Sequence, residues 1–324
     1  MEPPKTLPLV KVVATGGTIA NTPSGRLHAG EVADAIPALR KVARLEVEEL
    51  VRVASSAITV ENWLALSRRI NEILSTQPEV RGIVVTHGSN TLEETGYFLG
   101  LTVKSNRPVV LTAAQRQFTT LSSDSPKNFL QAVRVAASDE AAGMGALIVA
   151  NDLINAARDV SKDISSRLET YSSRDLGALG FVDDDRITFY RRPVKAHTRA
   201  APFDVLRLRE LPRVDIVYTY AGADGTLIEA AVAGGALGVV IAGFPTGSAT
   251  PPMDDAIAQA VARGIAVVMT NRGGMGRVFD KKAGEARPLL WGDNLTPVKA
   301  RILLMLALTT TRDPAALQRI LEQY

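Results

Sequence analysis

The stretch Leu9-Val10-Lys11-Val12-Val13-Ala14-Thr15-Gly16-Gly17-Thr18 decides the fold of this chain, because a short apolar strand runs directly into a turn of glycines and threonines. A second apolar strand, Gly82 to Val85, ends in a similar turn, Thr86-His87-Gly88-Ser89-Asn90-Thr91. In open α/β sheets, ligands bind beyond the carboxyl ends of the strands, and glycines there let backbone amides approach a ligand closely. The two turns therefore predict one shared site.

Outward from these turns, short apolar strands alternate with helical segments along the first half of the chain. Apolar residues between Val60 and Leu74, for example, recur at the spacing of one helix face. This alternation predicts a doubly wound, mostly parallel sheet. The expected strands are Leu9–Ala14, Val47–Ala54, Gly82–Thr86, Val109–Thr112 and Gly145–Val149, and the expected helices are Val60–Leu74, Leu92–Val103 and Asn128–Ala137.

The composition changes between Asp183 and Pro212, where acidic residues, a short strand at Ile187–Tyr190 and prolines indicate a hairpin followed by a linker. Strands and helices then alternate again, and 324 residues suffice for two domains. We expect a larger N-terminal α/β domain over residues 1–190, a linker over 191–212 and a smaller C-terminal α/β domain over 213–324. The expected C-terminal elements are strands Val214–Tyr220, Gly238–Ala242 and Ile265–Thr270, helices Thr226–Ala233, Met253–Arg263 and Pro297–Leu308, and a last helix capped by Asp313.

The composition also narrows the classes of function. The 37 Lys and Arg residues are dispersed and leave a formal net charge of only +3, which argues against a nucleic-acid-binding surface. There is no cysteine, and the three histidines lack the spacing of common zinc sites, so we expect neither a metal nor an organic cofactor. No apolar run reaches the length of a membrane span, and the first ten residues do not resemble a secretory signal, which predicts a cytoplasmic protein.

Thr18 is a candidate nucleophile. A threonine hydroxyl attacks a carbonyl group only when a base removes its proton and donors stabilise the resulting oxyanion. Thr18 follows two glycines at a strand end, where backbone N–H groups can converge. Alternatively, Thr15 or Thr18 only caps a helix or closes the turn. The glycine spacing differs from G-x-G-x-x-G, which argues against a dinucleotide-binding domain.

Two further segments carry polar groups that could serve such a site. Ser89-Asn90-Thr91 precedes Leu92-Glu93-Glu94 in the manner of a capped helix start, and the free N–H groups of a helix start attract carboxylates. These hydroxyls could therefore cap the helix, or an acidic substrate could dock beside them. Lys162 could act as a base if desolvation lowers its pKa, or it could be an ordinary surface lysine.

Taken together, these segments resemble the bacterial L-asparaginase/glutaminase family, and they are closest to its type II pattern. The resemblance runs nearly end to end and implies an amidohydrolase with a threonine nucleophile, a larger N-terminal and a smaller C-terminal domain. It also implies a homotetramer, a dimer of dimers, with active sites built between subunits. The segments that carry it are Ala14-Thr15-Gly16-Gly17-Thr18-Ile19-Ala20, His87 to Thr95, Arg158 to Lys162, Pro202-Phe203-Asp204-Val205 and the tail from Lys299 to Tyr324.

The resemblance assigns roles to individual residues. Thr18 matches the nucleophilic threonine, Ser89 stands where a second catalytic threonine is usual, and Lys162 matches the lysine that pairs with it. Ser55 matches a serine that holds the α-carboxylate of the substrate, and backbone amides near Gly88 and Ser89 are the candidate oxyanion donors. The expected substrate-binding residues are Gly17, Ser55, Ser56, Gly88 and Asn90.

The chain departs from the family pattern at several of these positions. Asn90 replaces an aspartate that contacts the lysine and the α-ammonium group of the substrate, and Ser56 replaces a glutamine. The short lid, Asn21 to Gly30, holds no tyrosine, and Leu27 or His28 falls near the position of the family's catalytic tyrosine. The segment where a neighbouring subunit supplies a glutamate has the sequence Asp280-Lys281-Lys282-Ala283-Gly284-Glu285.

These departures share one consequence, because an ammonium group in a dry pocket needs a compensating carboxylate or several acceptors. We therefore expect hydrolysis of a small primary amide that need not carry an α-ammonium group, with L-asparagine a poor or secondary substrate. The loss of the carboxylate at Asn90 should also favour a neutral Lys162 amine. Two alternatives remain open: Glu285 or another acid restores an ordinary asparaginase, or the chain is a catalytically silent ligand-binding protein.

Overall fold

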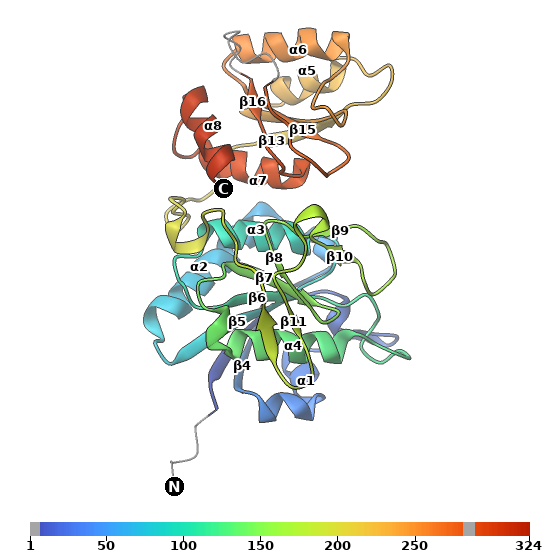
Figure 1. Cartoon of the computed structure of the whole chain (residues 1–324), viewed down its shortest axis with the longest axis vertical. Coiled ribbons are helices and arrows are strands. Elements are labelled where there is room, and N and C mark those ends of the chain that lie inside the picture. The colour runs from blue at the N-terminus through green and yellow to red at the C-terminus, as the bar shows by residue number, and fades with distance from the viewer. Residues whose placement is uncertain (1–6, 281–288) are drawn as a thin grey trace. The chain divides into compact units, whose positions relative to one another are not determined.

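The computed structural model describes residues 7–280 and 289–324, and the chain divides into two compact units (Figure 1). The first unit ends at Arg207 and the second begins at Leu208. The first contains a large, mostly parallel sheet with helices on both faces, and the second contains a smaller parallel sheet. The predicted fold class is therefore confirmed.

The sheet of the first unit has eight strands in the order β12-β11-β8-β7-β6-β5-β1-β4. Strands β4, β1, β5, β6 and β7 run parallel, while β8, β11 and β12 are antiparallel to their neighbours. The bounds are β1 Leu9–Gly16, β4 Arg44–Val53, β5 Val80–Thr86, β6 Val109–Thr112, β7 Ala146–Ala150, β8 Leu153–Ala156, β11 Gly180–Val182 and β12 Ile187–Phe189.

The sequence prediction missed β8 and β11, which continue the sheet beyond β7 and pair with their neighbours in antiparallel orientation. The chain reverses between β7 and β8 at Asn151 and Asp152, whose φ angles are 50° and 67°. Asn and Asp tolerate this left-handed conformation better than other residues with side chains, and a two-residue turn of this kind joins antiparallel strands directly. The Asn-Asp pair was thus the local signal for a hairpin.

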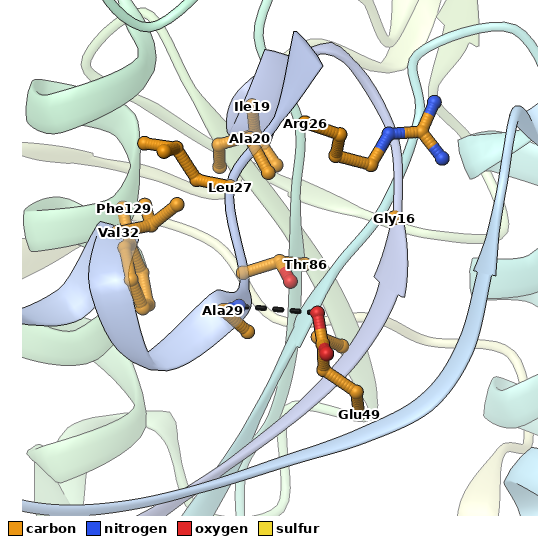
Figure 2. A pocket seen from close by; sticks show the side chains of 11 residues that line it. Gly16, Ile19, Ala20, Arg26, Leu27, Ala29, Val32, Glu49, Thr86 and Phe129 are labelled. Atoms are coloured by element: carbon orange, nitrogen blue, oxygen red, sulfur yellow. Dashed lines mark hydrogen bonds between the residues drawn. The ribbon is translucent and has the colours of Figure 1, made fainter. Parts of the chain in front are cut away.

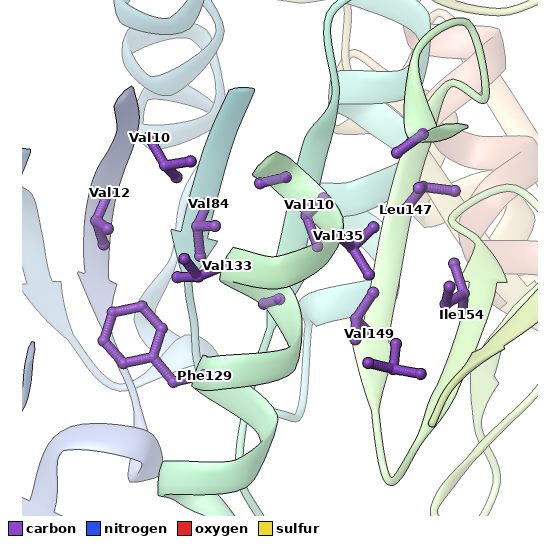
Figure 3. Close-up of a cluster of buried hydrophobic side chains, with 14 of the residues drawn as sticks. Val10, Val12, Val84, Val110, Phe129, Val133, Val135, Leu147, Val149 and Ile154 are labelled. Atoms are coloured by element: carbon purple, nitrogen blue, oxygen red, sulfur yellow. The ribbon is translucent and has the colours of Figure 1, made fainter. Parts of the chain in front are cut away.

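Alternate residues of the parallel strands face opposite layers of helices. Val10, Val12 and Val84 pack with Phe129 in the core against α4, as Figure 3 shows. Their neighbours, including Val13 and Ile83, pack in the core of the other face against α2 and α3. Because the central strands are covered on both sides, segments such as residues 12–14 and 83–85 are apolar throughout, whereas the edge strand β4 alternates apolar and charged residues. The helices are α1 Ala29–Asp34, α2 Val60–Thr76, α3 Leu92–Thr102 and α4 Ser125–Ala137.

Two small hairpins and two short turns lie beyond the carboxyl ends of these strands. All are too short to give a periodic sequence pattern, and neither they nor α1 were predicted. The hairpins are β2 (Asn21–Thr22) with β3 (Gly25–Arg26) and β9 (Ser161–Lys162) with β10 (Tyr171–Ser172), and the turns are the 3-10 helices Thr18–Ala20 and Ser55–Ala57.

The second unit repeats the α/β pattern on a smaller scale. Its four strands are parallel in the order β13-β14-β15-β16, and the last helix begins as predicted, with the Asp313 carboxylate accepting the N–H of Ala316 at 2.8 Å. Nowhere in residues 7–280 or 289–324 is there a helix long and apolar enough to cross a bilayer. The elements are β13 Val214–Tyr218, α5 Thr226–Ala233, β14 Gly238–Gly243, α6 Pro251–Ala262, β15 Ala266–Asn271, β16 Leu290–Trp291, α7 Pro297–Ala307 and α8 Pro314–Gln323.

Candidate active site

The two glycine-rich turns are in direct contact. Strands β1 and β5 are parallel neighbours, and the Thr15 hydroxyl donates to the carbonyl oxygen of Thr86 at 3.0 Å. Gly17 has a φ of 93°, and a Cβ atom placed on it would lie 2.4 Å from the backbone nitrogen and Cα of Gly88. No side chain fits at Gly17, and its left-handed backbone conformation also favours glycine. The structure therefore packs one turn against the backbone of the other.

Ser55 joins this contact from the end of β4. A Cβ atom on Gly88 would lie 2.6 Å from the Ser55 hydroxyl oxygen, which accepts the backbone N–H of Asn90 at 3.2 Å. The Thr91 hydroxyl donates to the carbonyl oxygen of Ser55 at 2.8 Å and makes no capping hydrogen bond to α3. The helix starts at Leu92 as expected, but Thr91, one of the residues that could have capped it, does not do so. Ser56 is exposed.

Ser89 and Lys162 meet although they lie 73 residues apart. The Lys162 amine donates to the Ser89 hydroxyl at 2.7 Å and to the Asn90 side-chain oxygen at 3.2 Å. The backbone N–H of Lys162 donates to the Glu93 carboxylate at 3.1 Å, which fixes the β9–β10 hairpin to the start of α3. The predicted residues Ser89, Asn90 and Lys162 thus form one hydrogen-bonded group.

Burial controls the ionisation of this group. Desolvation lowers the pKa of Lys162, and the neighbouring Asn90 carries no charge that would oppose this effect. The Tyr171 hydroxyl donates to the carbonyl oxygen of Ser89 at 3.1 Å, and burial raises the pKa of Tyr171 well above its ordinary value. Tyr171 is therefore a neutral donor that holds the Ser89 backbone. A neutral Lys162 amine could accept the Ser89 proton through the same 2.7 Å contact.

Thr18 begins the turn that follows Gly17 and is half-buried. Across the described ranges of the chain, its hydroxyl has no hydrogen-bond partner. In the same part of the structure, the backbone N–H groups of Gly88 and Ser89 have no acceptor, although both residues are buried. Buried N–H groups are nearly always paired, so these two donors are available for a ligand.

A buried chain of hydrogen bonds supports the second turn from behind. The Trp63 indole N–H donates to the Thr95 hydroxyl at 2.8 Å, and this hydroxyl donates to Nε2 of His87 at 3.0 Å because the other ring nitrogen carries the proton that binds a carbonyl oxygen. The Nδ1–H of His87 then donates to the carbonyl oxygen of Gly88 at 2.8 Å. Burial lowers the pKa of His87 to about 4, so the ring is neutral near pH 7 and has a structural role.

We expect Thr95→Val to lower the free energy of unfolding by at least about 2 kcal/mol, because it leaves the Trp63 indole N–H and Nε2 of His87 buried without partners. Equilibrium urea denaturation measures this change. Thr95→Ser keeps the hydroxyl and loses one buried methyl group, so it should cost only about 1 kcal/mol. Equal losses in the two variants would show that packing, and not the hydrogen-bonded chain, holds the turn.

The adjacent lid residues Leu27 and His28 have different surroundings in the structure. Leu27 lines a narrow pocket with Ile19, Val32 and Phe129 (Figure 2). The pocket volume of about 10 Å³ admits a single water molecule, so it is a packing gap and not a substrate cavity. His28 is exposed, and its Nδ1 lies 2.7 Å from a carboxylate oxygen of Glu49.

Other expectations concern the segment from Asp280 to Glu285, which lies outside the described residues after Asp280. The parts of the chain that the structure describes contain no group of three His, Asp or Glu side chains suited to a metal ion.

Tyr171 and Arg26 are neighbours of the site that sequence reasoning missed. Only their positions in turn-rich segments near Lys162 and Thr18 could have drawn attention to them.

Comparison with known proteins gives matches over nearly the whole chain. The family model described as asparaginase, N-terminal, matches residues 9–195, and that of the glutaminase/asparaginase C-terminal domain matches residues 213–321. L-asparaginase 2 of Bacillus subtilis is 41% identical over 99% of this chain and 88% of its own length. L-asparaginase 2 of Escherichia coli is 38% identical over 98% and 94%. The crystal structure of a probable cytoplasmic L-asparaginase from Campylobacter jejuni superposes with a TM-score of 0.94 at 37% identity, covering 98% of this chain and all of the other.

Proposed function

Because this chain belongs to the L-asparaginase/glutaminase family of hydrolases, which act on amide C–N bonds, we propose that it hydrolyses the primary amide of a small carboxylic acid through Thr18. The observation that supports this most directly is the group formed by Ser89, Asn90 and Lys162 beside two backbone donors, the N–H groups of Gly88 and Ser89, that have no acceptor in residues 7–280 and 289–324. In the proposal this group supplies the base and the oxyanion site for Thr18, whose turn packs on Gly88 through Gly17 and whose hydroxyl has no partner of its own within the described residues.

In the proposed reaction, the Thr18 oxygen attacks the carbonyl carbon of the amide, and the N–H groups of Gly88 and Ser89 stabilise the oxyanion. A neutral Lys162 amine receives the Thr18 proton through the Ser89 hydroxyl. The C–N bond then breaks, ammonia leaves with one added proton, and an ester joins the acyl group to Thr18. Water attacks this ester, which releases the carboxylate and restores the Thr18 hydroxyl.

The proposed substrate carries no α-ammonium group. Once a bound substrate excludes water, such a group needs a carboxylate, and the exposed Asn90 offers only an amide oxygen that already accepts from Lys162. The nearby Glu93 carboxylate already accepts the backbone N–H of Lys162. An amide acid with hydrogen in place of the ammonium group avoids this cost altogether.

Ammonia release tests the proposal with two matched substrates. Succinamate is L-asparagine with hydrogen in place of the α-ammonium group. We expect its kcat/KM to exceed that of L-asparagine by about 10-fold or more, because no charge is left uncompensated in the pocket. A preference for L-asparagine would overturn the substrate proposal, and an absence of ammonia with every small amide would favour a silent ligand-binding protein.

We also propose a homotetramer with active sites shared between subunits, and a cytoplasmic location. The tetramer rests on the family resemblance, and large apolar side chains are exposed on both units within the described residues. The location rests on the name of the Campylobacter jejuni relative alone. The exposed apolar side chains include Phe181, Tyr190 and Val194 in the first unit and Tyr218, Tyr220 and Leu227 in the second.

A further inference from the structure

Arg26 places a guanidinium group beside the first glycine-rich turn. It lies at the end of the β2–β3 hairpin, and its Nε–H donates to the side-chain oxygen of Asn21 at 2.8 Å. A Cβ atom placed on Gly16 would lie 3.1 Å from a terminal nitrogen of Arg26. Figure 2 shows the side chain reaching across the backbone at Gly16, away from the aliphatic wall that includes Leu27. The guanidinium therefore lies beside Gly16, which precedes Thr18 by two residues in the sequence.

The same position adjoins the end of β4. Gly16 pairs with Val53, and the Cβ position on Gly16 is also 2.5 Å from the Val53 carbonyl oxygen. Two residues after Val53, Ser55 contacts Gly88 and Asn90. Arg26 is thus near the ends of both strands that lead into the candidate substrate-binding residues.

Arg26 forms no ion pair with any carboxylate in the part of the chain that the structure describes. Arg26 and Glu49 both line the narrow pocket beside Leu27. The Glu49 carboxylate already accepts the backbone N–H of Ala29 at 3.1 Å and binds Nδ1 of His28. The guanidinium of Arg52 donates to the carbonyl oxygen of Arg26 and adds further positive charge to the hairpin. Glu49 also interacts electrostatically with Arg52, so the guanidinium of Arg26 is the cation of this hairpin that has no carboxylate partner within the described residues.

We propose that Arg26 is a specificity-determining residue that binds the carboxylate of the substrate, so that the enzyme selects anionic monoamides of dicarboxylic acids. This inference rests on the proposed function and adds the group that recognises the acid end of the substrate. An amide acid without an α-ammonium group carries a net negative charge, and a half-buried guanidinium compensates that charge through charge-assisted hydrogen bonds.

Arg26→Gln tests this with succinamate and its neutral isostere succinamide, in which an amide replaces the carboxylate. We expect kcat/KM for succinamate to fall about 10- to 100-fold, mainly through KM, because a charge-assisted hydrogen bond is lost. The value for succinamide should change less than about 3-fold, since it offers no charge to Arg26. Equal losses for both substrates, or no loss for either, would overturn the proposal.

Two further variants separate charge from hairpin geometry. Asn21→Ala removes the anchor of Arg26 but keeps its charge, so kcat/KM for succinamate should fall less than in Arg26→Gln and that for succinamide should change less than about 3-fold. Compared with Arg26→Gln, Arg26→Lys should recover part of the preference for the anionic substrate.

Binding gives a readout independent of turnover: succinate should raise the Tm of the wild-type protein and not that of Arg26→Gln. If no ammonia is released but this difference persists, the proposed function fails and the anion site stands. If the Tm of both proteins responds equally, the anion site fails.

Discussion

Thr18→Ala should lower the turnover of succinamate by about 1,000-fold or more and leave the free energy of unfolding within about 1 kcal/mol of the wild-type value. The first effect follows because no other group would supply the oxygen that attacks the amide carbon. The second follows because the Thr18 side chain is half-buried and its hydroxyl binds no other group in residues 7–280 and 289–324. Single-turnover ammonia release and urea denaturation measure the two quantities.

Thr18→Ser is the matched control, because it keeps a hydroxyl at the same position and should retain most of the activity lost in Thr18→Ala. Mass spectrometry after rapid acid quenching adds a direct test of the covalent step. The wild-type protein should gain the mass of one acyl group on the peptide that contains Thr18, and Thr18→Ala should gain none. Wild-type turnover in Thr18→Ala would remove this residue from the chemistry.

The parallel part of the fold and the two glycine-rich turns could be predicted from sequence because each signal is local. A run such as residues 12–14 is apolar throughout because both faces of the strand are covered, and Gly17 marks a backbone conformation and a close contact that side chains prohibit. Short antiparallel pairs escaped prediction. The hairpin β9–β10 has two residues in each strand, so its pairing depends on tertiary contacts such as the bond from Lys162 to Glu93.

Residue roles within the candidate site were harder to predict than the turns that carry them. The contact between Ser89 and Lys162 links segments 73 residues apart, and only the family resemblance joined them before the structure did. Arg26 escaped notice because its position depends on how the β2–β3 hairpin folds over Gly16. Thr91 shows the limit of a local pattern, since a sequence typical of a helix cap instead binds the backbone of Ser55 in the turn after β4.

Asn90→Asp should change both the pH dependence and the substrate preference, because it places a carboxylate where an amide oxygen now lies 3.2 Å from the Lys162 amine. Burial alone lowers the pKa of Lys162 from its ordinary value of 10.5, and an adjacent negative charge stabilises the ammonium form and raises the pKa again. If the neutral amine is the base, activity is lost as the pH falls through this pKa. The acidic limb of the kcat profile should therefore move to higher pH in the variant.

The same carboxylate would supply the partner that an α-ammonium group requires, so the ratio of kcat/KM for L-asparagine to that for succinamate should rise about 10-fold or more. Asn90→Ala is the matched control, since it removes the amide without adding charge and should change neither the limb nor the ratio in this direction. Rate profiles for both substrates from about pH 5 to about pH 10 measure both effects. An unmoved limb would exclude Lys162 as the base, whereas an unmoved ratio would show that the missing carboxylate at position 90 does not set the preference.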